Sequence, residues 1–281
     1  MKNSLQNIFT SPKPIISMLH LGYLLGTPQF TSVDELIKKA EYDIKACQEN
    51  GIDGLLIENW KEDSIGEFVS PETAISLAMI VRELAKSIKI PFGINVLNND
   101  YKTALSIAKL AGAKFVQQDV YVDHVVSDFK YSPLGAANPF EIHPSPQKIQ
   151  EYAKSIGAQN IPLFVFVQPK HYKMLDPSKT IEQSATEAAS LGASALLVTK
   201  ETGSAPTLDL IKRAKSASNN IPVGIGSGFS EANAAEFIPV VDFAVVGTSI
   251  KVDNVTDNPV DPAKVKSLMS TVKALVSCFP R

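Results

Sequence analysis

The amino-acid sequence predicts an α/β protein that folds as a single (β/α)₈ TIM barrel of the phosphate-binding type. Three observations indicate this fold: eight short apolar runs, amphipathic stretches of helical period between them, and two glycine-containing segments near the end of the chain. The chain has 281 residues, 44% hydrophobic and 20% charged, which suits one globular barrel domain. We expect residues 14–281 to form the barrel and residues 1–13 to be an irregular leader.

The eight apolar runs are the expected strands. Four begin at a proline, which removes no ladder bond at the first position of a strand and stops the preceding helix. Three begin at or shortly after a glycine that suits the left-handed position at the end of a helix, and one lacks this glycine. In chain order the runs are 14–19, 51–58, 91–96, 112–119, 162–167, 192–199, 222–226 and 243–246.

The stretches between the runs are the expected helices. The first, 33–50, begins with a capping box in which Ser32 caps and Glu35 reaches back. The last, 262–276, has Asp261 as its N-cap and a proline at the first helical position. This alternation favours a closed parallel barrel over an open doubly wound sheet, which usually carries a glycine-rich phosphate turn after its first strand.

Long segments follow the first, second, fourth and fifth expected strands. The segment after the fourth, residues 121–147, is rich in proline and poor in periodic apolar positions. Long segments that follow the strands of a barrel are usually lids or binding loops. We expect residues 121–147 to cover the mouth of the barrel and to be more mobile than the strands.

Two segments after the seventh and eighth strands form the candidate phosphate site. Residues 224–230 precede a helix expected to open at Glu231, and residues 246–249 are followed by Lys251. Successive glycines let backbone N–H groups converge on an anion, and these two loops are where barrels bind phosphate; tight turns are the alternative. The expected substrate-binding residues here are Gly226, Ser227, Gly228, Gly247, Thr248 and Ser249.

Polar residues end several of the other strands. Glu58, Asp119 and Thr199 share one offset, so all three should face the mouth. His20 ends the first strand, and Asn95 lies inside the third, where an amide needs a polar partner or a ligand. We expect Glu58, Asp119 and His20 to be catalytic, and Asn95 and Thr199 to bind substrate.

Each of these residues has a structural alternative. Glu58 could form a buried ion pair with Lys170 or Lys200. His20 could be a cap or a hydrogen-bonded core residue. Lys170, which we also place among the catalytic candidates, could be part of a solvated Lys170-His171 loop, and Asp63 a solvated turn residue.

Several classes of ligand are not expected. No run of basic residues suggests nucleic acid, no apolar stretch is long enough for a membrane span, and no clustered Cys/His motif suggests zinc. We therefore expect no metal site, no cofactor and a cytoplasmic location, although Glu58 and Asp119 leave Mg²⁺ open. A homo-oligomer is possible, and the expected partner is a phosphorylated small molecule.

The ordered motifs resemble those of the BtpA/SgcQ family of barrel proteins, named for a photosystem I biogenesis factor and a predicted sugar or nucleoside enzyme. The resemblance runs from about Pro14 to Lys251. The matching motifs are Met18–Gly22, Leu25–Pro28, Gly51–Gly54, Glu58-Asn59, Pro91–Leu97, Asn99-Asp100, Gly226–Gly228 with Asn233, and Val246–Lys251.

The chain departs from the family pattern at the chemical end of the site. Residues 117–119 read Gln-Gln-Asp where the family has Arg-Val-Asn, and the Lys-His pair after the fifth strand is displaced to 170–171. The Thr-Gly pair after the sixth strand becomes Thr199-Lys200, with Thr202-Gly203 kept. The resemblance therefore implies phosphate binding more directly than it implies a shared reaction.

Our leading hypothesis is an enzyme that cleaves a C–N or C–O bond of a phosphorylated sugar or nucleoside, or isomerises it. Glu58, with Asp119, would do the acid/base work while Asn95 and His20 orient the substrate. One alternative, implied by the family name, is a non-catalytic biogenesis or assembly factor that keeps the barrel. Another is an aldolase or lyase that forms a Schiff base on Lys170 or Lys200.

Overall fold

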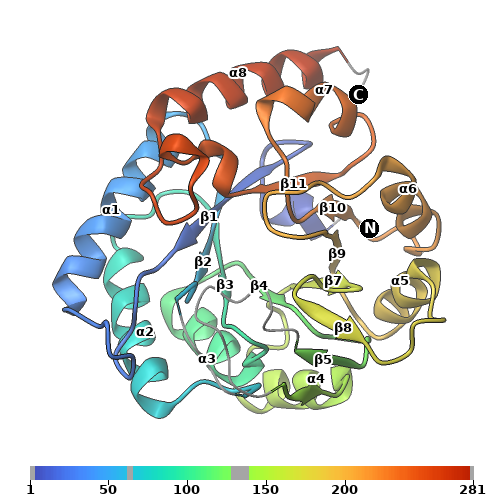
Figure 1. Ribbon diagram of the computed structural model, residues 1–281, viewed down its shortest axis with the longest axis horizontal. Coiled ribbons are helices and arrows are strands. Elements are labelled where there is room, and N and C mark those ends of the chain that lie inside the picture. Colours follow the sequence, from blue (N-terminus) through green and yellow to red (C-terminus); the bar gives the residue numbers. More distant parts are fainter. Residues whose placement is uncertain (1–3, 62–65, 128–138, 279–281) are drawn as a thin grey trace.

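Eight parallel strands close into a barrel in the computed structural model, which describes residues 4–61, 66–127 and 139–278. All eight expected strands are confirmed, and consecutive barrel strands are neighbours around the ring (Figure 1). The barrel strands are β1 Ile15–His20, β2 Gly54–Glu58, β3 Phe92–Asn95, β4 Phe115–Gln118, β7 Leu163–Val167, β9 Ala195–Val198, β10 Val223–Ile225 and β11 Phe243–Val246.

A ring of helices surrounds the strands (Figure 1). The two expected N-caps are confirmed: Ser32 Oγ accepts the Glu35 N–H at 3.2 Å, and Asp261 Oδ1 accepts the Ala263 N–H at 2.8 Å. The reciprocal bond from the Glu35 side chain, expected for a capping box, is not formed. The helices are α1 Val33–Glu49, α2 Pro71–Leu84, α3 Tyr101–Ala111, α4 Pro146–Ser155, α5 Ile181–Ser190, α6 Leu208–Ser216, α7 Ala234–Phe237 and α8 Pro262–Ser277.

The helix expected at Glu231 is much shorter than its neighbours. It consists of a 3₁₀ turn, Glu231–Asn233, followed by α7 with four residues. The side chain of Asn233 turns back to accept from the Ser230 N–H at 2.9 Å and donate to the Gly228 carbonyl at 2.8 Å. A helix this short has little dipole to offer an anion, so that part of the expectation is corrected.

Aromatic and aliphatic side chains fill the lower barrel interior. The rings of Phe115 and Phe164 stack at a centroid distance of 4.6 Å. Space for the Phe115 ring exists because residue 93 is glycine, where a Cβ would lie 2.3 Å from that ring. This apolar floor confines the buried polar side chains to the top of the barrel.

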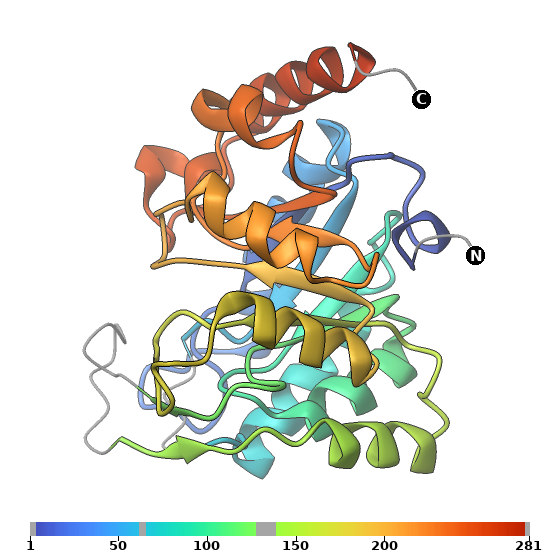
Figure 2. The same cartoon turned by 90° about the vertical axis from the view of Figure 1, so that its right-hand side faces the viewer.

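Residues 4–9 are more than an irregular leader. They contain the 3₁₀ turn Ser4–Asn7, and the side chains of Leu5 and Phe9 are buried in the same cluster as the barrel interior. Figure 2 shows this segment at the end of the molecule opposite the small sheet described next. The leader therefore closes the floor of the barrel.

A small antiparallel sheet lies on the mouth side, and two of its strands come from the segment expected to cover the mouth. It consists of β5 Val125–Ser127, β6 Glu141–Ile142 and β8 Tyr172–Met174, in the order β6-β5-β8. Val125 and Ile142 pack with Val120 and Tyr172 in a cluster of their own. The described part of 121–147 therefore contains regular strands, its greater mobility stays a prediction, and residues 128–138, with Pro133 and Gly135, lie outside the described residues.

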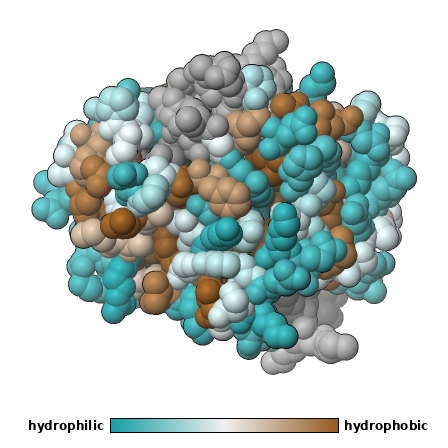
Figure 3. Space-filling model, turned by 90° about the horizontal axis from the view of Figure 1, so that it is seen from below, coloured by the Kyte–Doolittle hydropathy of each residue, from teal (hydrophilic) through white to brown (hydrophobic). Residues whose placement is uncertain are grey.

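The outer surface mixes apolar and polar side chains. On the face shown in Figure 3, hydrophobic and hydrophilic residues are interspersed. Among residues 4–61, 66–127 and 139–278, no helix is long and apolar enough to cross a membrane.

Candidate active site

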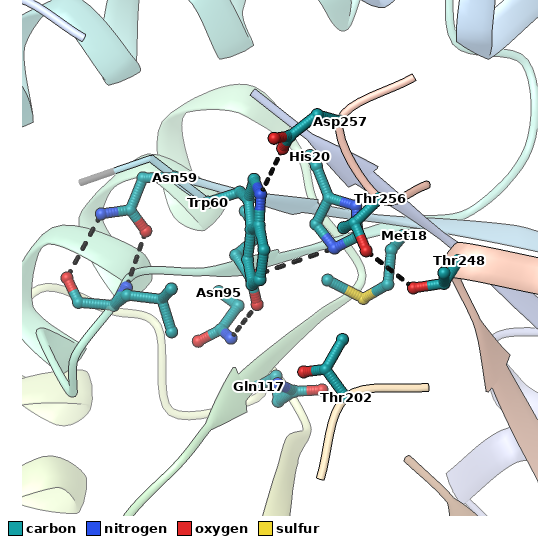
Figure 4. Close-up of polar contacts among 12 residues, drawn as sticks. Met18, His20, Asn59, Trp60, Asn95, Gln117, Thr202, Thr248, Thr256 and Asp257 are labelled. Atoms are coloured by element: carbon teal, nitrogen blue, oxygen red, sulfur yellow. Dashed lines mark hydrogen bonds and ion pairs between the residues drawn. The ribbon is translucent and has the colours of Figure 1, made fainter. Parts of the chain in front are cut away.

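The mouth of the barrel carries a row of buried polar side chains from adjacent strands. His20, Glu58 and Asn95 are partners in the register of β1, β2 and β3, so their side chains lie in one layer. Asn95 Nδ2 donates to Glu58 Oε2 at 2.7 Å and to Asp119 Oδ1 at 3.2 Å. One amide therefore joins the two carboxyl groups chosen as catalytic candidates from the sequence, and Figure 4 shows Asn95 among the polar side chains of the barrel mouth.

Burial makes both carboxyl groups weak acids. It raises the pKa of Glu58 to about 7, with a further increase from the Asp119 charge. It also raises the pKa of Asp119, to about 6, against the opposing effects of Lys170 and of hydrogen bonds from Gln117 and Asn95. Near neutral pH the pair can therefore hold one proton and release it over a small pH range.

His20 is a neutral neighbour of this pair. Its Nε2 lies 3.8 Å from Glu58 Oε1, and its ring is 5.1 Å from the Trp60 ring (Figure 4). Burial, and then the charges of Lys251, Lys170 and Lys61, hold the pKa of His20 well below its usual value. Its Nδ1 is buried without a hydrogen-bond partner among the described residues, which leaves that atom available to a ligand.

Lys170 lies at the mouth on a tightly fixed turn after β7. Its pKa is lowered by desolvation, and its Nζ lies 6.0 Å from the centre of the Phe166 ring. Asp123 holds the turn, because its buried carboxylate accepts from the Gln168 N–H at 2.6 Å and from Ser184 Oγ at 2.6 Å. His171 follows with its pKa lowered to about 4 by burial and by Lys170, and its Nε2 lies 2.9 Å from Thr202 Oγ1.

The ion pair considered for Glu58 does not form with either lysine. The basic side chain nearest to Glu58 among the described residues is that of His20, which is neutral. Lys170 acts on Glu58 only through a longer-range charge effect, and Lys200 is exposed. Asp63 lies outside the described residues.

Sequence reasoning missed three residues near the carboxyl groups. Gln117 Nε2 donates to Asp119 Oδ1 at 3.3 Å, and Tyr172 is partly buried with a pKa raised well above its usual value by desolvation and by both carboxylates. Asp123, the third, is buried and holds the Lys170 turn. A buried polar residue in the apolar stretch 120–126 was the signal that could have revealed Asp123.

The glycine loops and the carboxyl pair line adjoining cavities. A cavity of about 770 Å³ reaches the loops after β10 and β11, and a small cavity of about 60 Å³ reaches Glu58 and Asp119. The residues that line both cavities are Met18, His20, Lys170, Thr202, Gly226 and Val245. A ligand in the larger cavity can therefore place a reacting group next to the carboxyl pair.

The side chains of Thr199 and Ser227 are used within the protein. Thr199 Oγ1 donates to Ser227 Oγ at 3.1 Å, and Ser227 Oγ also accepts from the Lys200 N–H at 2.9 Å. Gly228 has φ +68°, and a Cβ there would lie 2.1 Å from the Ala205 nitrogen. These residues fasten the loop after β10 to the loop after β9, so any contact with an anion would come from the backbone.

The loop after β11 is fastened in a similar way. Ser249 Oγ donates to the Phe229 carbonyl at 2.7 Å, and Thr248 Oγ1 lies 2.8 Å from Thr256 Oγ1. Lys251 is buried and donates to Asp43 Oδ2 at 2.6 Å, away from the glycine loops. Lys264, at the start of α8, is one of the two lysines that line the larger cavity, and it lies beside these loops.

The carboxyl pair does not fit Mg²⁺ in this arrangement. The Asn95 nitrogen, an N–H donor, lies within hydrogen-bond distance of both carboxylates, where a cation would need oxygen ligands.

Comparison with known proteins agrees with the motif resemblance. The model of the BtpA family matches residues 11–274. An uncharacterized protein of Archaeoglobus fulgidus is 30% identical over 249 residues, covering 87% of this chain and 94% of that one. The photosystem I biogenesis protein BtpA of Synechocystis sp. is 27% identical over 267 residues, covering 94% and 89%.

Solved structures of known enzymes share the barrel. Tryptophan synthase from Mycobacterium tuberculosis has a TM-score of 0.59 at 15% identity and covers 93% of both chains. N-(5'-phosphoribosyl)anthranilate isomerase from Pyrococcus furiosus has a TM-score of 0.52 at 15% identity and covers 93% of this chain and 99% of that one. At this identity the likeness establishes the fold alone.

We predict that Glu58→Gln keeps the fold and removes a pH dependence of stability. The pKa of Glu58 in the folded protein, about 7, exceeds the usual value of 4.5, so between these values the folded state binds more protons than the unfolded state. Wild-type stability should therefore fall as pH rises through this window, by about 1.4 kcal/mol for each unit of pKa shift. Urea denaturation below 4.5 and above 7 measures the effect.

Glu49→Gln is the matched control, because Glu49 is exposed on α1. It should leave the wild-type pH dependence unchanged. A Glu58→Gln protein that lost several kcal/mol above pH 7 would instead indicate a stabilising buried ion pair.

Proposed function

This chain belongs to the BtpA family, and we propose that it is an enzyme that acts on a phosphorylated sugar or nucleoside at the mouth of its barrel. The observation that carries the proposal is the buried Glu58–Asn95–Asp119 group, whose carboxyl groups have pKa values of about 7 and about 6. Groups with pKa values near the working pH are the most effective general acids and bases. They lie beside a cavity large enough for a small ligand.

The carboxyl groups suit two different roles in the cleavage of a C–N or C–O bond. Glu58, with the higher pKa, keeps a proton near neutral pH that it can give to the leaving nitrogen or oxygen. Asp119, with the lower pKa, can accept a proton from water or stabilise positive charge on the sugar. Isomerisation would use the same pair to move a proton between two carbon atoms or from carbon to oxygen.

The rest of the mouth supports binding and orientation. Neutral His20 offers its unpartnered Nδ1, and Asn95 fixes the positions of both carboxyl groups. Gly226 and Gly247 border the larger cavity, where backbone N–H groups can approach an anion closely.

Lys264 supplies positive charge to the same cavity. Its Nζ donates to the Lys251 carbonyl at 2.9 Å and to Asn254 Oδ1 at 2.8 Å. An ammonium has three donors, so one remains for a phosphate oxygen. These features support a phosphate at this end of the cavity.

The names of similar proteins suggest two different roles for the barrel mouth, one catalytic and one in biogenesis. One structural neighbour is an isomerase of a phosphoribosyl compound, while the Synechocystis relative is named a biogenesis protein. A non-catalytic role in biogenesis is the alternative that this second name suggests. Ligand binding at the mouth without turnover by any phosphorylated sugar or nucleoside would favour it.

We predict that Lys264→Ala weakens the binding of ribose 5-phosphate by about tenfold or more, because loss of one charge-assisted hydrogen bond costs roughly 1.5–3 kcal/mol. Isothermal titration calorimetry with ribose 5-phosphate and ribose measures the change. Ribose should bind weakly to both proteins. Lys266→Ala, which removes an exposed lysine from the same helix, is the control and should bind like the wild type. Equal losses in both variants would reject a phosphate site here.

Lys170 favours a second candidate, a Schiff-base aldolase or lyase. It lines both cavities, and its lowered pKa makes a larger fraction of its amine neutral and nucleophilic. Lys200, the other lysine considered, is exposed.

On this second candidate, borohydride reduction in the presence of dihydroxyacetone phosphate should attach one ligand to Lys170, identified by mass spectrometry of peptides. Lys170→Met should abolish the adduct, and Lys200→Met should retain it. A uniform low level of labelling on many surface lysines, unchanged in Lys170→Met, would exclude this reaction and leave the acid/base proposal intact.

A further inference from the structure

Three metal-ligating side chains meet on the small sheet, away from the carboxyl pair. His124, Glu141 and His143 each place one ligand atom within 4.8 Å of the others. They come from the residue before β5, from β6 and from the residue after β6. This group could not be predicted from the sequence, because the residues are spread over twenty positions and form no short motif.

The strand register puts the three side chains on one face. Val125 pairs with Ile142 and Val126 with Glu141, and continuing this register places His124 opposite His143. Side chains alternate between faces along a strand. Since Val125 and Ile142 point into the apolar cluster of the sheet, both histidines and Glu141 point outward together.

The distances fit a tetrahedral metal ion. His124 Nε2 lies 3.2 Å from Glu141 Oε2, and His143 Nε2 lies 3.6 Å from the same oxygen. Ligands at about 2.1 Å from a tetrahedral zinc ion are separated by roughly 3.4 Å, which falls between these two values. The two imidazole rings already lie close, with centroids 4.3 Å apart.

We propose that His124, Glu141 and His143 form a binding site for a divalent metal ion of the zinc class. Two imidazole nitrogens and a carboxylate oxygen form a donor set that suits Zn²⁺, and a water molecule would complete the tetrahedron. The ion would tie the start of β5 to β6, a strand of only two residues. It would thereby stabilise the sheet whose third strand, β8, carries Tyr172 beside the carboxyl pair.

Cobalt substitution tests the proposal on tag-free full-length protein. Wild type should bind one equivalent of Co²⁺ with the intense visible absorption of a tetrahedral site, and Zn²⁺ should displace it. The double variant His124→Ala/His143→Ala should lose this spectrum and bind Zn²⁺ at least about 100-fold more weakly, since even the loss of an outer-sphere partner costs 10–100-fold. His171→Ala removes a histidine at the barrel mouth and should bind like the wild type.

Two results would overturn the proposal. One is a wild-type protein that takes up no stoichiometric Co²⁺ or Zn²⁺, and the other is uptake that survives in the double variant. Because all three ligands are at least partly exposed, the metal-free variants should melt like the metal-free wild type, so lost binding cannot be attributed to unfolding. Zn²⁺ should raise the melting temperature of wild type and His171→Ala only.

Discussion

The amide of Asn95 is the constraint on which the barrel mouth depends. Its two N–H groups reach Glu58 and Asp119, which come from strands on either side of β3. Two buried carboxylates repel each other. The repulsion is smaller when one of them carries a proton and a hydrogen-bond donor lies between them. The barrel supplies the burial, the register supplies the distances, and together they produce two acids with pKa values near neutrality.

The interior is divided into an apolar floor and a polar top. Stacked rings such as Phe115 and Phe164 exclude water below the carboxyl pair, and Leu5 and Phe9 complete this floor from the N-terminal segment. A dry floor strengthens every electrostatic effect above it. The hydroxyl groups of Thr199, Ser227 and Ser249 fasten neighbouring loops, which fixes the glycine backbones that border the cavity.

Much of the fold could be predicted from the sequence because local signals repeat along the chain. Prolines and glycines marked seven of the eight barrel strands, and Ser32 and Asp261 marked two helix starts. Strand-end positions also brought Glu58, Asn95 and Asp119 to one place, because residues with the same offset in parallel strands share a layer. BtpA family membership followed from ordered motifs in the same way.

The features that could not be predicted from the sequence depend on contacts between distant segments. The small sheet joins residues 125–127 to 172–174, a pairing that no local pattern encodes. No local pattern encodes the Lys251–Asp43 ion pair either, which directs the Lys251 side chain away from the expected phosphate site. The same is true of Asp123, which holds the Lys170 turn through Gln168, a residue 45 positions later in the sequence. The burial of Leu5 and Phe9 could not be predicted, because they look like isolated hydrophobic positions in a polar segment.

The central claim is that the two carboxyl groups joined by Asn95 share a proton near neutral pH. Carbon-13 NMR of the labelled side-chain carboxyl carbons, assigned with Glu58→Gln and Asp119→Asn, measures this directly. We predict midpoints near 7 for Glu58 and near 6 for Asp119, with each curve altered when the other group is removed. Independent titrations at the ordinary values of 4.5 and 3.8 would show that both groups are solvated, and would contradict the account.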